Sequence, residues 1–285
     1  MGQNTSIEWT DHTFNPWWGC VKVSPGCANC YAETWAKRYG NDLWGKNAPR
    51  KTFSDSHWSE PVKWNTQAAA DGKRRRVFCA SMSDVFEDHP AVAGERERLW
   101  TLIGKTPALD WLLLTKRPEN MLRFAPWVET WPENVWAMTS VENQTVAAQR
   151  IPVLLDVPAH IRGLSVEPLL GPLDLTRWLH GIHWVIVGGE SGPSARPMHP
   201  AWVTRIQRDC REAGVAFFFK QWGAWSPLRM EVDLAVAPES FMVKVGKGNA
   251  GRTLHGRTWD ELPRAGRARR PRIDTLTPLP AIEAG

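Results

Sequence analysis

The stretch "DWLLLTKRP" at residues 110–118 shows the pattern that decides the fold: an unbroken apolar run that ends abruptly in charged residues. The same pattern recurs in five further stretches: "RVFCASMSD" (76–84), "NVWAMTSVEN" (134–143), "HIRGLSVEP" (160–168), "HWVIVGGESG" (183–192) and "VAFFFKQWG" (215–223). Continuous runs rich in Val, Leu, Ile and Phe are typical of strands buried on both faces. The sheet is therefore predicted to be parallel.

Helical patterns separate these runs. Helices are predicted at 31–39, 91–104, 119–124, 143–150 and 200–213, with a further piece of unassigned structure near 58–71. With a further strand near 11–16, this alternation is typical of either a doubly wound open sheet or a partial or complete (β/α) barrel. In a barrel, functional residues gather at the carboxyl ends of the strands. The polar residues there would then ring a single mouth: Cys20, Asp84, Lys116, Glu142, Glu167 and Glu190. We favour a TIM-like (β/α) barrel over residues 1–225, with a C-terminal extension at 226–285.

The composition is that of an ordinary globular protein, with 285 residues, 42% of them hydrophobic and 23% charged. No stretch approaches the roughly 20 apolar residues needed to span a bilayer. The N-terminus lacks the basic-then-apolar layout of a signal peptide. We therefore expect a cytoplasmic protein without a membrane partner.

The net charge is +5, and much of the excess lies in "GRTLHGRTWDELPRAGRARRPRI" at 251–273. Such a basic tail either follows the phosphates of a nucleic acid or is a solvated flexible end. The chain also has 18 tryptophans against 2 tyrosines. Tryptophan offers a flat face for stacking on bases, although most of these side chains are expected to lie in the core.

Three of the five cysteines lie in "GCVKVSPGCANCYAE" at 19–33. In a reducing compartment such a cluster indicates metal binding or redox chemistry rather than disulfides. The turn at Pro25 folds the loop so that Cys20, Cys27 and Cys30 can face one centre. A zinc site is one interpretation, with His12 as the fourth ligand. The other is a 4Fe-4S cluster, which cysteine thiolates hold and which three of them would leave with one open iron.

The cysteine loop resembles the cluster-binding loop of radical S-adenosylmethionine (SAM) enzymes, which follows the first strand of a partial (β/α) barrel. The usual spacing there is C-x3-C-x2-C, whereas the first gap here has six residues and Asn29 stands at the usual aromatic position. Over roughly 5–225 the chain also resembles a phage-encoded three-cysteine-motif family of unknown function. The matching segments are "NPWWGC", "SPGCANCYAE", "SDVFED", "LLLTKRPEN", "SVENQ", "SVEPLLGP" and "GGESG".

This resemblance implies that Cys20, Cys27 and Cys30 hold a 4Fe-4S cluster and that SAM is the second cofactor. It also implies an external electron donor. At the end of the second strand, where radical SAM enzymes bind the amino group of the cofactor, this chain has Ser81, Ser83 and Asp84. Helix capping by Asp84 is the competing interpretation.

The other strand ends supply further candidates for binding SAM or its substrate. Lys116 and Arg117 suit a carboxylate or a phosphate. The remaining candidates are Ser140, Glu142, Asn143, Glu167, Gly188, Gly189 and Glu190. The first three are placed to hold a ribose, and "GGESG" (188–192) can bind either cofactor or substrate. A structural ion pair is the competing role for each charged residue, and we assign no catalytic residue.

Two functions follow from these observations. The first is a radical SAM enzyme that generates a 5′-deoxyadenosyl radical for hydrogen abstraction, with a nucleobase or nucleic acid as candidate substrate. The second is a non-catalytic nucleic-acid-binding protein that a zinc ion or an iron–sulfur cluster holds together.

Overall fold

The computed structural model describes residues 5–231 and 233–263. Its centre is a sheet of seven strands in the order β1-β2-β3-β4-β5-β6-β7, and every neighbouring pair is parallel. The strands are β1 (His12–Thr13), β2 (Arg75–Cys79), β3 (Leu109–Thr115), β4 (Val135–Ser140), β5 (Ile161–Val166), β6 (Trp184–Gly188) and β7 (Ala216–Gln221). All seven predicted strands are confirmed.

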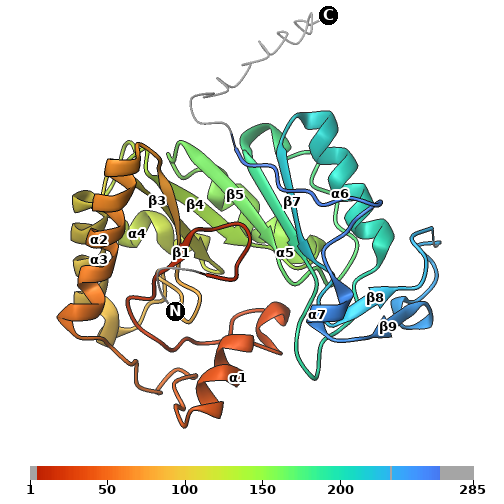
Figure 1. Ribbon diagram of the computed structural model, residues 1–285, viewed down its shortest axis with the longest axis horizontal. Coiled ribbons are helices and arrows are strands. Elements are labelled where there is room, and N and C mark those ends of the chain that lie inside the picture. The colour runs from red at the N-terminus through yellow and green to blue at the C-terminus, as the bar shows by residue number, and fades with distance from the viewer. Residues whose placement is uncertain (1–4, 232, 264–285) are drawn as a thin grey trace, which may run out of the picture.

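The strand order decides between the two predicted architectures. A doubly wound sheet reverses direction within its strand order, whereas here every strand adds to the same edge. The sheet curls into a half-barrel with helices along its outer side (Figure 1). This confirms the prediction of a partial TIM-like barrel.

The connecting helices fall close to their predicted places, and the unassigned piece near 58–71 is also a helix. They are α1 (Tyr31–Arg38), α2 (Asp55–Asp71), α3 (Ala93–Lys105), α4 (Met121–Phe124), α5 (Gln144–Leu155) and α6 (Pro200–Ala213). Gly72 and Gly214 end α2 and α6 in the left-handed conformation that glycine adopts at no steric cost. Helices α2, α3 and α6 flank the sheet, whereas α1 lies apart from them at the lower edge of Figure 1. None of the helices in the described ranges is both long and apolar enough to cross a bilayer.

The inner face of the half-barrel is apolar toward the amino ends of the strands. A cluster of buried residues fills it, with Trp184 at 0% exposure, and Trp9 from the N-terminal segment packs among the strand residues. The other members are Phe78, Leu112, Trp136, Met138, Ile161, Ile186 and Phe218. Because side chains alternate along a strand, the same inner rows continue upward as Lys116, Ser140, Ser165 and Lys220. The lumen is therefore filled by apolar side chains toward the amino ends of the strands and is polar at their carboxyl ends.

A buried ion pair fixes the long segment between α1 and α2. Arg50 is fully buried, and its guanidinium donates to both carboxylate oxygens of Glu87 at 2.8 and 2.9 Å and to the backbone oxygens of Leu43 and Ala48. The pair ties this segment to the residues that follow β2.

Beyond β7 the chain packs back on the barrel. An antiparallel pair, β8 (Trp225–Pro227) and β9 (Met242–Lys244), precedes the short α7 (Lys247–Ala250). Trp259 O accepts from the backbone of Phe219 at 3.0 Å, and Glu261 O accepts from the indole of Trp184 at 2.9 Å. The part of the predicted basic tail from Arg264 onward, which holds five of its seven arginines, lies outside the described residues.

Candidate functional site

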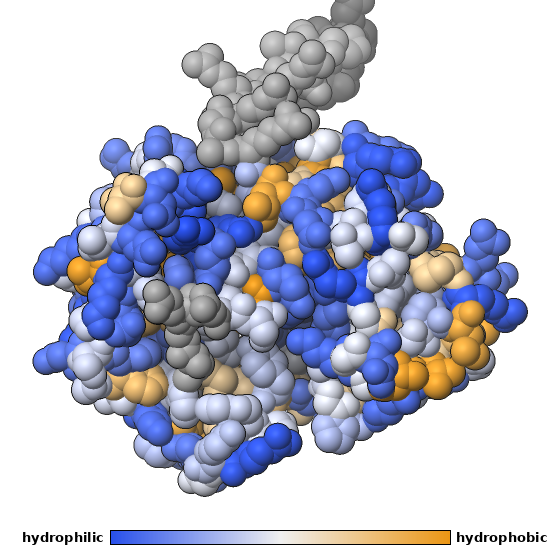
Figure 2. Space-filling model, viewed as in Figure 1, coloured by the Kyte–Doolittle hydropathy of each residue, from blue (hydrophilic) through white to orange (hydrophobic). Residues whose placement is uncertain are grey.

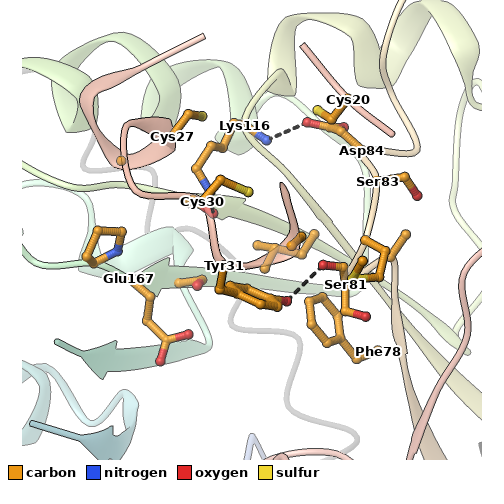
Figure 3. Close-up of a pocket in the computed structure, with 18 of the residues that line it drawn as sticks. Cys20, Cys27, Cys30, Tyr31, Phe78, Ser81, Ser83, Asp84, Lys116 and Glu167 are labelled. Carbon is orange, nitrogen blue, oxygen red and sulfur yellow. Dashed lines mark hydrogen bonds between the residues drawn. The ribbon is translucent and has the colours of Figure 1, made fainter. Parts of the chain in front are cut away.

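A cavity of about 710 Å³ opens at the carboxyl ends of the strands. Its wall contains most of the residues predicted from the strand ends. These are Cys20, Cys27, Cys30, Ser81, Ser83, Asp84, Lys116, Arg117, Ser140, Glu167, Gly189 and Glu190. The chain thus brings residues that are far apart in the sequence to one mouth (Figure 3). Glu142, Asn143 and Gly188 are not in that wall.

The cysteine loop connects β1 to α1 and is fixed at both ends. Gly19 pairs with Ser83 next to β2, and a Cβ at Gly19 would lie only 2.6 Å from Leu43 O. Its φ of +110° also favours glycine. At the other end Cys30 precedes the first turn of α1. The loop therefore enters and leaves the mouth along defined paths.

The three thiols are free and lie around Lys116, with Cys27 and Cys30 on one side in Figure 3 and Cys20 on the other. Burial, together with the negative charge of Asp84, raises the pKa of Cys20 to about 12 against the opposing effect of Arg117. Burial also raises the pKa of Cys30. Both side chains are therefore thiols at neutral pH.

The donor set fits an iron–sulfur cluster, because three free cysteines from one loop face one cavity and thiolates hold such clusters. Within the described ranges, no three His, Cys, Asp or Glu side chains are placed closely enough to hold a metal ion. Closing the sulfur atoms on one centre thus requires a rearrangement of the loop or its side chains. His12 stacks on Trp64 at 4.4 Å and lines a separate pocket, so it is not a fourth ligand here.

Arg117 ties the first part of the loop to the barrel. Its guanidinium donates to Val21 O at 2.7 Å, to Cys20 Sγ at 3.6 Å and to Asp84 Oδ2 at 2.8 Å. Asp84 also accepts from the backbone N–H groups of Phe86 and Lys116 and from the hydroxyl of Thr115. Four donors therefore use both oxygens of Asp84, which we had expected to bind an ammonium group.

Glu142 supports the middle of the loop. It is fully buried, pairs with Arg150 at 3.2 Å and accepts from the hydroxyl of Ser24 at 2.7 Å. Gly26 packs so closely here that a Cβ would lie 2.5 Å from the carboxylate. Asn143, next in the chain, accepts from Val146 N and caps α5. Both residues thus have structural partners outside the cavity wall.

Glu190 supports the loop from β6. Its carboxylate accepts from the Arg196 guanidinium at 2.6 and 2.8 Å and from Asn29 Nδ2 at 3.0 Å, and Arg196 also donates to Pro25 O. Burial raises the pKa of this carboxyl, but the hydrogen bonds from Arg196 and Asn29 outweigh it and lower the pKa. We call these three Arg–carboxylate pairs, at Asp84, Glu142 and Glu190, the loop brace.

The β2–β4 side of the mouth holds a lysine and three serines, of which Ser81 already bonds through its hydroxyl to Asn15. Lys116 Nζ donates to Ser140 Oγ at 3.2 Å and has further donor capacity. The hydroxyl of Ser83 is buried and has no hydrogen-bond partner among the described residues. Ser81 O accepts from the hydroxyl of Tyr31 at 2.8 Å. This side presents a cation and hydroxyl groups.

The β5–β7 side presents hydrogen-bond acceptors. Glu167 Oε2 accepts from Lys220 Nζ at 3.0 Å, whereas Glu167 Oε1 is buried and has no partner among the described residues. Gln221 donates to Gly189 O at 3.0 Å, and its Oε1 is likewise buried without a partner there. Gly188 packs against Glu167, where a Cβ would lie 2.5 Å from Oε1. We call Glu167, Lys220 and Gln221 the acceptor wall.

Sequence reasoning missed Lys220, Gln221, Arg196 and Asn29. A signal for Lys220 and Gln221 existed, since "FFFKQ" (217–221) ends a buried run in polar residues as the other strands do. Arg196 lies in a loop six residues after Glu190 and had no such signal.

Fold and mouth together define the chain as a parallel half-barrel with a three-cysteine loop at its open end. Residues 4–263 match the family described as Protein of unknown function (DUF5131), and the chain belongs to this family. None of the curated proteins matches the chain.

Two solved structures are similar at low identity. A spore photoproduct lyase complexed with dinucleoside spore photoproduct is 14% identical, covers 73% of this chain and 63% of its own, and gives a TM-score of 0.46. A double mutant of such a lyase, with bound AdoMet and dinucleoside spore photoproduct, is 13% identical over 72% of this chain and 61% of its own, with a TM-score of 0.42. The chain spans less than two thirds of the length of these lyases.

Proposed function

We propose that this protein is a radical SAM enzyme. The observation that carries the proposal is the convergence of three free cysteines from one loop on a polar cavity at the carboxyl ends of a parallel half-barrel. Cys20, Cys27 and Cys30 would hold the 4Fe-4S cluster. When bound, the cluster and SAM supply one chemistry: an electron from an external donor cleaves SAM into methionine and a 5′-deoxyadenosyl radical, which abstracts a hydrogen atom.

The protein's own residues would hold the reactants in place and exclude water. Lys116 is suited to the carboxylate of SAM because its ammonium group already lies at the cavity wall, 3.2 Å from the hydroxyl of Ser140. Ser81 and Ser83 offer oxygen atoms to polar groups of the cofactor. Glu167 and Gly189 would contact the cofactor or the substrate on the opposite side.

Two features of the structure favour preorganisation for this role. The loop brace holds the cysteine loop from β3, β4 and β6 at once. The apolar lower lumen closes the cavity from below. A nucleobase or nucleic acid is the candidate substrate, because aromatic residues at the mouth and the basic segment at 251–273 suit bases and phosphates.

The test is an anaerobic reconstitution with iron and sulfide. We expect about four irons per chain, followed by release of 5′-deoxyadenosine from SAM when a strong reductant is added. Ala substitution of Cys20, Cys27 or Cys30 should abolish both. The matched control is Cys210→Ala, because Cys210 is buried in α6 away from the mouth. Bound zinc with intact SAM would contradict the proposal and favour the non-catalytic nucleic-acid-binding protein.

A further inference from the structure

The exposed aromatic residues of this chain are concentrated on one helix. Among the described residues, the aromatic side chains classed as exposed are Tyr31 (56%), Trp35 (37%) and Tyr39 (63%). They follow each other at intervals of four residues from the start of α1 to the residue after it, so they lie on one helical face. Both tyrosines of the chain belong to this set. We call these three residues the aromatic stripe.

The stripe is a continuous surface that begins at the cavity. Tyr31 and Trp35 both line the cavity wall, and the rings of Trp35 and Tyr39 are 4.6 Å apart. Trp35 also contacts Trp18 at 5.2 Å, edge to face. Along a helix axis, eight residues span roughly 12 Å, which is the length of three to four nucleotides at about 3.4 Å each. The adjacent face of α1 is the buried one, with Ala32 and Ala36.

The segment that carries the stripe has more exposed cations than acidic residues. The exposed cations of the cysteine loop, α1 and the following segment are Lys22, Lys37, Arg38, Lys46 and Lys51, and the acidic residues there are Glu33 and Asp42. Glu33 pairs with two of the cations, Lys22 and Lys37, each at 2.7 Å. Lys51 lies over the ring of Trp18 at 4.8 Å. In Figure 2 the surface over α1, at the lower edge, is pale and blue with little orange.

Flat aromatic faces with interleaved cations are what single-stranded nucleic acids require, because every base has a face to stack and every nucleotide a phosphate. A neutral sugar would use the rings but not the cations. An apolar protein segment would use neither the cations nor a surface this polar. Charge complementarity therefore favours a single-stranded nucleic acid as the ligand of this surface.

We propose that the aromatic stripe binds a single-stranded nucleic acid by base stacking and leads it to the cavity mouth. Tyr39 and Trp35 would stack successive bases, Tyr31 would stand at the entrance, and Arg38 with its neighbouring cations would contact phosphates. That the strand enters the cavity as substrate rests on the proposed function. Binding to the stripe does not depend on it.

The experiment is fluorescence anisotropy of the full chain with labelled 12-nucleotide oligothymidylate and oligouridylate at low salt. We expect Trp35→Ala and Tyr39→Ala each to weaken binding about 5- to 150-fold, the range measured for loss of one base–aromatic stack. Tyr39 is 63% exposed, so its substitution leaves folding intact even where Trp35→Ala does not. The matched control is Leu122→Ala in α4, a side chain 51% exposed on another helix, and it should bind as the wild type does.

A duplex of the same length should bind more weakly than either single strand, since its bases are already stacked. No binding at low salt would overturn the proposal, as would wild-type affinity in the Tyr39→Ala protein or equal affinity for duplex. Measuring both oligonucleotide binding and 5′-deoxyadenosine release on the wild-type protein distinguishes a failure of this inference from a failure of the proposed function. Stripe-dependent binding without 5′-deoxyadenosine release contradicts only the enzyme, and release without oligonucleotide binding contradicts only the stripe.

Discussion

Four carboxylates stand just beyond the ends of β2, β4, β5 and β6, and their surroundings are of two kinds. Asp84, Glu142 and Glu190, in the loop brace, each pair with an arginine and accept further bonds that hold the chain around the mouth. Glu167, in the acceptor wall, pairs with Lys220 through one oxygen and leaves the other buried without a partner among the described residues. Glu142 and Glu167 even follow the same tripeptide pattern, Ser-Val-Glu at 140–142 and 165–167.

This difference distinguishes carboxylates that support the cysteine loop from one that keeps an oxygen without a partner. A carboxylate whose oxygens already accept several donors has little capacity for a ligand, so the brace acts on the cysteine loop rather than on a bound molecule. A buried acceptor without a partner costs about 1–3 kcal/mol. Glu167 Oε1 therefore contributes nothing to stability as it stands, in contrast to the oxygens of the brace.

The largest expected effect is on the brace. Glu142→Ala leaves the guanidinium of Arg150 buried without its carboxylate and removes the acceptor of Ser24. We expect the free energy of unfolding to fall by roughly 3–5 kcal/mol, the usual cost of breaking a buried pair. Urea denaturation measures this change.

Glu129→Ala is the matched control, because Glu129 is exposed. Its effect should stay within about 0.5 kcal/mol. Alkylation of Cys27 should also become faster in the Glu142→Ala protein, since Ser24 lies in the same loop, 3.7 Å from its sulfur. Equal stability of the two variants would show that the brace does not hold the loop.

The sequence predicted the seven strands and the single mouth because buried parallel strands have a strong local signal. It also placed Lys116 and Glu167 correctly at the cavity wall. It could not separate Glu142 from Glu167, because the partners Arg150 and Lys220 lie on other elements and only the folded chain brings them together. Arg196 was missed for the same reason, since its contacts to Pro25 and Glu190 span the mouth.

A double variant at the acceptor wall tests whether its ion pair contributes less to stability than those of the loop brace. The double variant Glu167→Leu with Lys220→Met replaces the pair, whose side chains are 15% and 18% exposed, by apolar groups of similar size. Because one oxygen of Glu167 has no partner to lose, we expect the variant to be as stable as the wild type or more stable by about 1 kcal/mol. Thermal and urea unfolding both measure this.

The parallel double variant Glu142→Leu with Arg150→Met provides the contrast. It should lose stability, because the bonds to Ser24 and to Ser140 O are lost with the pair. If both double variants lose stability equally, then the Glu167–Lys220 pair stabilises the fold as much as the Glu142–Arg150 pair does. The unpaired oxygen of Glu167 would then not mark a different role.

The smallest expected effect is the pH dependence of the brace at Glu190. The folded-state pKa of this carboxyl is lowered, so its contribution to stability is fully present above the unfolded-state pKa of about 4.3 and is lost as the pH falls through the folded-state pKa. The stability difference between the wild type and Glu190→Gln should therefore shrink as the pH decreases from about 6 to 3. Asn29→Ala removes one donor and keeps Arg196, so that protein should retain part of the dependence. A difference that stays constant over this range would mean that the charge of Glu190 does not hold the loop, and the brace would then act through Asp84 and Glu142 alone.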